Sequence, residues 1–176
     1  MRRTGVFVAV LAVTLLVATA GSAARPAVTI SLSRPSVVYG GSVSLSVTTT
    51  AGGHWTDVVK PTIETSYEAN WKSATSSTVT VKVRPLITLT LVNLSTGSFS
   101  TKVTAARSFA GKFVLVQRLG SSGVATQKKV ILDTNSSATF RVRLHQGRSR
   151  LRVVMPTSQT APGYITGVSK VLTVSR

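Results

Sequence analysis

Titratable side chains that could perform acid–base chemistry are scarce in this 176-residue chain. The sequence holds four acidic residues, two histidines and no cysteine. General acid–base catalysis needs such groups brought together, and the two acids closest in sequence are Glu64 and Glu68. On a strand spanning residues 65–71, Glu68 projects away from the core and Glu64 precedes the strand. We therefore expect both to be solvated surface residues, and we expect no catalytic residues and no enzyme.

Metal and cofactor motifs are also missing from the sequence. His54 and His145 fall in different parts of the chain with no cysteine or acidic cluster beside them, so the ligand spacing of a zinc site is absent. No serine lies in a Gly-x-Ser-x-Gly motif, and neither a phosphate loop nor a dinucleotide-binding glycine pattern occurs. We expect no metal, no cofactor and no small-molecule substrate.

Basic side chains are the one candidate for a functional set. Two pairs of arginines alternate with apolar residues, so each pair should share the outward face of a strand. The predicted polyanion-binding residues are Lys128, Lys129, Arg141, Arg143, Arg148, Arg150 and Arg152. The plainer interpretation is that outward positions of an exported protein need a polar residue and that arginine meets this need.

Charge along the chain favours the binding interpretation. The formal net charge is +17, from 21 basic and four acidic residues. Residues 25–84 carry six basic and three acidic side chains, whereas residues 85–176 carry thirteen basic and one acidic. Such a field concentrates anionic polymers at a surface, and salt screens it. We expect an anionic extracellular or cell-wall polymer as partner. Nucleic acid is disfavoured because aromatic residues are not interleaved with the basic ones and because the chain has an export signal.

Residues 1–24 have the pattern of a secretory signal peptide. Arg2 and Arg3 precede an uncharged apolar run at residues 6–18, and small residues follow up to Ala23 and Ala24, where cleavage is expected. A retained membrane anchor is the alternative, but the run is shorter than the about 20 residues that span a bilayer. Membrane contact is expected only before cleavage. An exported chain without cysteine indicates a secreted bacterial protein, released or held to the cell wall by contacts.

The rest of the chain alternates apolar and polar residues with a period of two, which predicts an all-β protein. A strand–loop–strand pattern at residues 65–85 recurs near the C-terminus, which indicates two tandem modules, residues 25–85 and 86–176. Five strands are predicted in the first module, at residues 28–32, 43–47, 55–60, 67–71 and 79–83. Seven are predicted in the second, at residues 87–91, 99–103, 113–119, 127–132, 140–144, 151–155 and 171–174.

Three segments carry a likeness to a known family: YGGSVSLS at residues 39–46, GGHWTDVVKPTIETSYEANW at 52–71 and SSTVTVKVRP at 76–85. They resemble the tandem immunoglobulin-like β-sandwich repeats of secreted bacterial surface proteins. The resemblance implies two such sandwiches, used by that family as spacers, adhesion modules or binding modules alike. It also implies that the strands of Arg141 and Arg150 belong to opposite sheets, so that these arginines flank one end of a sandwich without forming one patch.

The first module departs from this family pattern in its length. A sandwich of this kind needs roughly 100 residues, and only about 60 lie between residue 25 and Pro85. Between Val47 and Trp55 there is room for a turn only, so the central strands are predicted to be missing and the module to be partly open. An open edge invites pairing. The alternative function is therefore a structural spacer or a self-assembling subunit that pairs through this edge.

Aromatic residues of the first module are predicted to be structural. Tyr67 begins a strand near the end of the module, where a tyrosine hydroxyl often bonds to the backbone. Trp55 and Trp71 are predicted to be core residues, because large aromatic side chains dominate small cores.

Overall fold

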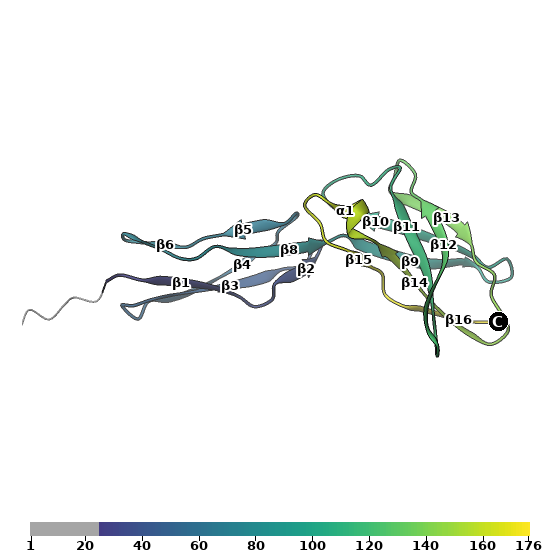
Figure 1. Cartoon of the computed structure of the whole chain (residues 1–176), viewed down its shortest axis with the longest axis horizontal. Helices are drawn as coiled ribbons and strands as arrows, with labels where there is room; N and C mark the ends of the chain where they lie inside the picture. Colours follow the sequence, from purple (N-terminus) through teal and green to yellow (C-terminus); the bar gives the residue numbers. More distant parts are fainter. Residues whose placement is uncertain (1–24) are drawn as a thin grey trace, which may run out of the picture.

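The computed structural model describes residues 25–176, so the predicted signal peptide lies outside the described residues. The described chain is mostly β-structure, as the alternation predicts, with one four-residue helix. Two lobes follow each other along the long axis of the molecule in Figure 1. We call residues 25–85 the N-terminal lobe and residues 86–176 the C-terminal lobe.

The N-terminal lobe is formed by short strands. They are β1 (Val28–Leu32), β2 (Ser36–Val38), β3 (Val43–Thr49), β4 (His54–Val59), β5 (Thr65–Tyr67), β6 (Asn70–Trp71), β7 (Ala74–Thr75) and β8 (Val79–Arg84). One sheet has the order β1–β3–β4, a second has the order β2–β8–β5, and β6 pairs with β7 at the tip. Val43 and Val47 on β3 and Val81 and Val83 on β8 are buried, because alternate residues of the two sheets face each other.

All five strand predictions for this lobe overlap an observed strand, but three details differ. The two-residue strand β7 was not predicted. The three-residue strand β2 was missed because it runs parallel to β8, and sequence alternation carries no information on such a pairing. The strand predicted at residues 67–71 is broken between β5 and β6. The Ser76 hydroxyl accepts a hydrogen bond from the Ala69 backbone N–H at 2.9 Å, so a side chain replaces the strand ladder there.

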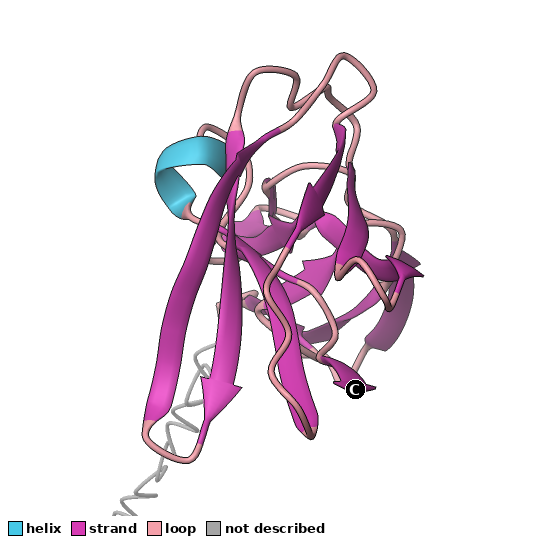
Figure 2. Ribbon diagram, turned by 90° about the vertical axis from the view of Figure 1, so that its right-hand side faces the viewer, coloured by secondary structure: helices cyan, strands magenta, loops and turns pink. Residues whose placement is uncertain are grey.

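The C-terminal lobe has eight strands and one helical turn. They are β9 (Leu86–Asn93), β10 (Ser98–Thr104), β11 (Phe113–Gly120), β12 (Gly123–Ile131), β13 (Ser137–Arg141), β14 (Arg148–Met155), α1 (Thr157–Thr160), β15 (Gly167–Val168) and β16 (Leu172–Ser175). One sheet has the order β13–β10–β9; the other has the order β12–β11–β14, with β15 and β16 both on β14. Each of the seven predicted strands overlaps an observed strand, although the one predicted at residues 140–144 shares only residues 140–141 with β13; β15 and α1 were missed. The turn α1 lies at one side of the lobe in Figure 2.

The core of the C-terminal lobe lies between its two sheets. Phe99 of β10 and Phe140 of β13 stack with ring centroids 6.1 Å apart. Val116 on β11 and Leu151 and Val153 on β14 face them from the other sheet and are fully buried.

This core continues across the boundary at Pro85. Val37 and Val83 of the N-terminal lobe belong to the same cluster of buried side chains as Ile87 and Phe99 of the C-terminal lobe. A small separate cluster of Val28, Val47 and Ala69 fills the far tip of the N-terminal lobe. The boundary is therefore packed with apolar side chains, and it is not a hydrated linker.

The connection between β14 and β15 joins the two lobes. Its Tyr164 is almost fully buried and meets the Phe109 ring edge to face at 5.8 Å. The Tyr164 hydroxyl donates a hydrogen bond to the Thr62 carbonyl of the N-terminal lobe at 2.6 Å. The same hydroxyl accepts one from the Ala106 backbone N–H of the C-terminal lobe at 3.0 Å. One side chain thus links the backbones of both lobes.

Backbone hydrogen bonds support the same junction. The Ile165 N–H donates to the Val83 carbonyl at 3.0 Å, and the Glu64 N–H donates to the Gly163 carbonyl at 2.9 Å. Gly163 has a positive φ of 87°, and any Cβ there would collide with the Ile63 side chain. Only glycine allows the two segments to approach so closely.

The aromatic residues of the N-terminal lobe differ in part from their predictions. The prediction that the Tyr67 hydroxyl bonds to the backbone is wrong: within residues 25–176 it has no hydrogen-bond partner, and Tyr164 fills such a role instead. Trp71 is half-buried and packs against the tip cluster. The prediction of a core position for Trp55 is wrong, since 42% of its surface is exposed. Trp55 lies on β4, and no facing sheet covers that strand.

Replacing Tyr164 by phenylalanine tests the junction. The ring would remain, but the Thr62 carbonyl and the Ala106 N–H would lose their partner in a partly buried place. We expect the free energy of unfolding to fall by about 1–3 kcal/mol, measured by urea denaturation. Tyr67→Phe is the matched control and should change it by less than about 0.5 kcal/mol. Equal effects of the two substitutions would contradict the bridging role.

Candidate functional site: the basic face of the C-terminal lobe

Strand β14 places three of the predicted arginines on one face. Ser149, Leu151 and Val153 alternate with the arginines and are buried, which turns Arg148, Arg150 and Arg152 outward. Arg148 and Arg150 are exposed, and Arg152 is half-buried. The Arg152 Nε donates a hydrogen bond to the Gln117 Oε1 of the neighbouring strand β11 at 2.9 Å. This contact fixes Arg152 and leaves its four terminal N–H donors for a ligand.

Strand β12 adds a lysine to the same face. Lys129 lies opposite Leu115 of β11, and Leu115 and Gln117 point to the side on which Arg152 lies. The Lys129 Nζ sits 3.9 Å from the centroid of the Phe113 ring, a cation–π contact that holds it over the sheet. Two strand spacings, roughly 10 Å, separate the backbones of β12 and β14. We call Lys129, Arg148, Arg150 and Arg152 the basic face.

Lys128 points to the other side of β12. It lies opposite the fully buried Val116, and it is nevertheless exposed because β12 is the edge strand of its sheet. It therefore lies at the rim of the sandwich beside the basic face.

Arg141 and Arg143 belong to the other side of the lobe. Arg141 is the last residue of β13 and lies opposite Ser98 of β10. The ladder ends there, but Val142 and Leu144 stay buried, so the alternation continues and Arg143 is exposed. The strands of Arg141 and Arg150 lie in opposite sheets, as the family resemblance implied. The seven predicted residues are thus divided between two faces of the lobe.

Two further arginines have structural contacts, and the sequence analysis did not single them out. Arg118 lies opposite the buried Leu151, on the inward side of β11. Its Nη2 donates to the Arg143 carbonyl at 2.5 Å, which ties the two sheets together. The signal for this was present, because Arg118 continues the inward alternation of Val114 and Val116.

Arg107 is the second of these arginines. Its Nη2 donates to the Thr160 carbonyl at 2.5 Å and to the Ala161 carbonyl at 3.0 Å. Its guanidinium group also lies 5.0 Å from the Phe109 ring centroid and 5.6 Å from that of Tyr164. Arg107 therefore fastens the connection that joins the lobes, and it is not part of the basic face.

The acidic residues lie outside the strands of the basic face, and His145 lies on the connection that leads into β14. The Asp133 carboxylate accepts hydrogen bonds from the Asn135 and Ser137 backbone N–H groups at 2.8 and 2.9 Å, which shapes the turn after β12. His54 and His145 are both exposed, on β4 and after β13. Within residues 25–176 no three His, Asp or Glu side chains come together as metal ligands would. The helix found in this part of the chain is also far too short to cross a membrane.

No protein-family model matches the sequence. A search of curated proteins finds no match either. The assignment of a function therefore depends on the geometry of the surface.

Two substitutions separate the structural arginine from the surface ones. Arg118→Met removes the bond from the half-buried Arg118 to the exposed Arg143 carbonyl, and we expect the free energy of unfolding to fall by about 0.5–1.5 kcal/mol. Arg150→Met changes an exposed side chain and should alter it by less than about 0.5 kcal/mol. Urea denaturation measures both. Equal stability of the two variants would show that Arg118 does not clamp the sheets.

Proposed function

We propose that this is a secreted, non-catalytic protein of two tandem immunoglobulin-like modules that binds anionic extracellular or cell-wall polymers. The observation that carries the proposal is the basic face, on which three arginines and a lysine project from one rigid sheet. The one acidic residue of the C-terminal lobe, Asp133, is occupied by its own turn.

Strand order in the C-terminal lobe supports the immunoglobulin-like part of the proposal. The hairpins β9–β10 and β11–β12 lie in different sheets, β13 returns to β10, and β14 returns to β11. Sandwiches of that family alternate their strands between two sheets in the same way. The N-terminal lobe is the shortened module, with an uncovered edge strand β4. The apolar leader at residues 1–24 supports secretion.

The physical basis of binding is electrostatic. Cations held by a sheet meet successive anionic groups of a polymer with little loss of side-chain freedom, because Arg152 and Lys129 are already positioned by Gln117 and Phe113. Each contact releases counterions from the polymer, so affinity depends steeply on salt. Lys128 at the rim and Arg141 and Arg143 on the opposite face raise the local concentration of the polymer.

Charge reversal tests this proposal on the full chain. The variant R148E/R150E/R152E should bind heparin, used as an anionic polysaccharide probe, on the order of 100-fold more weakly, since each surface cation contributes about 1 kcal/mol. The control R34E/K60E/K82E has the same change in net charge on exposed residues of the N-terminal lobe. We expect a clearly smaller loss for it, and a smaller loss for R141E/R143E as well.

Titration of bound protein against sodium chloride measures these affinities. Wild-type retention should fall steeply as the salt concentration rises, and the triple variant should show a shallower dependence. Binding that is indifferent to salt, or an equal loss in the N-terminal control, would overturn the proposal.

A further inference from the structure

Several strands of the described chain end a sheet, and two of these free edges, on β4 and β9, differ in character. Strand β4 ends the sheet β1–β3–β4 and has exposed apolar side chains at Trp55 and Val58, the latter 61% exposed. Strand β9 ends the sheet β13–β10–β9 and is eight residues long. Unpaired N–H and C=O groups on such edges are a template for another strand.

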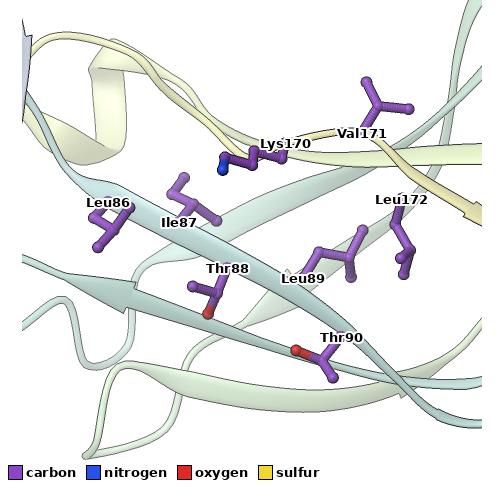
Figure 3. A pocket seen from close by; sticks show the side chains of 8 residues that line it. All are labelled: Leu86, Ile87, Thr88, Leu89, Thr90, Lys170, Val171 and Leu172. Atoms are coloured by element: carbon purple, nitrogen blue, oxygen red, sulfur yellow. The ribbon is translucent and has the colours of Figure 1, made fainter.

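A groove lies beside the free edge of β9 (Figure 3). It has a volume of about 390 Å³, with residues 86–90 of β9 as one wall and residues 170–172 as the other. Leu89 of β9 faces Leu172 across it, the Lys170 side chain extends over Ile87, and Val171 points away from β9. The groove exists because β15 ends at Val168 and β16 begins only at Leu172, so the sheet opposite β9 is interrupted there.

We propose that β4 of a second copy of this chain docks along the free edge of β9 and fills this groove. The sheet β1–β3–β4 of one molecule would then continue into β9–β10–β13 of the next. This mode of recognition is β-strand addition, in which backbone hydrogen bonds give affinity and alternate side chains give specificity.

The alternation of side chains fits this occupant. Trp55, Asp57 and Val59 lie opposite Val47, Leu45 and Val43 of β3, and they therefore point to the inward face of their own sheet. Ile87 and Leu89 point to the inward face of theirs, toward the groove. Since a continuous sheet shares one inward face, Trp55 and Val59 enter the groove as apolar anchors. Asp57, between them, faces Lys170.

Charge distinguishes the pairing of β4 with β9 from two alternatives, β9 with β9 and β4 with β4. Two β9 edges meeting would bring together two C-terminal lobes that each carry a net charge of +12. Two β4 edges meeting would bring two Asp57 carboxylates onto one uncovered face, and like charges opposite each other destabilise strand pairs. Three of the four acidic residues lie in the N-terminal lobe. Both lobes are net positive, but of these three pairings only that of β4 with β9 places an acidic side chain, Asp57, beside a basic one, Lys170.

This inference goes beyond polyanion binding. It adds the edge of β9 as a second surface to the alternative function of self-assembly through β4. Neither Asp57 nor Lys170 belongs to the basic face, which is on the outward side of the other sheet. Reversal of the β14 arginines would therefore abolish polymer binding and leave the strand pairing, so the two proposals fail separately.

The absence of cysteine allows a direct cross-linking test. Thr56 on β4 and Thr88 on β9 are both exposed and both on the outward face. If β4 of one molecule pairs with β9 of another, a short bismaleimide should join the variants Thr56→Cys and Thr88→Cys. Mixing the two full-length variants, one of them enlarged by a tag, should give the mixed dimer. Lys82→Cys, an exposed position on the central strand β8, mixed with Thr88→Cys is the matched control and should give none.

Charge exchange tests the proposed Asp57–Lys170 contact. Asp57→Lys and Lys170→Asp should each lower the yield of mixed dimer roughly tenfold, and the double exchange should restore it. Both residues are exposed, and an unchanged circular dichroism spectrum would show that each variant is folded. No cross-link between positions 56 and 88, equal cross-linking of the control pair, or no recovery in the double exchange would overturn the proposal.

Discussion

Burial of one apolar layer across both lobes is the constraint on which the structure depends. The chain has no cysteine, so covalent cross-links do not contribute, and a lobe of about 60 residues buries too little surface to be stable with ease. The N-terminal lobe compensates by sharing its core with the larger lobe through Val83 and Ile87. The connection around Tyr164 closes this shared core, with Arg107 holding the connection in place.

The surface follows from the same constraint. Once alternate residues of β14 are committed to the core, the intervening positions must face away from it, and on this strand they are mainly arginine. A rigid sheet then presents the cations at fixed spacing. The core is incomplete beside the edge strand β4, which is why the inward-facing Trp55 is exposed. Binding of polymers and pairing of strands thus depend on different parts of one sandwich.

Much of the fold could be predicted from the sequence, because alternation of apolar and polar residues shows which side of a strand faces inward. That is why seven of the eight strands of the C-terminal lobe, at least in part, and the outward direction of Arg150 were predicted correctly. Alternation does not show whether another sheet covers the inward side, and Trp55 was therefore wrongly predicted to be buried. Nor does alternation reveal contacts between distant segments. The parallel pairing of β2 with β8 could therefore not be predicted, nor that the hydroxyl of Tyr164, and not that of Tyr67, bonds to the backbone. Arg118 follows the inward alternation, but arginine side chains usually face solvent, so its inward position was not predicted.

Equilibrium unfolding in urea, followed by two probes, tests the shared core most directly. Both tryptophans lie in the N-terminal lobe, so their fluorescence reports on that lobe, while far-UV circular dichroism is dominated by the longer strands of the C-terminal lobe. Lobes that share a core unfold together, and we expect the two probes to give one coincident transition. An earlier fluorescence transition, with the circular dichroism signal still intact, would contradict a core that is continuous across the boundary.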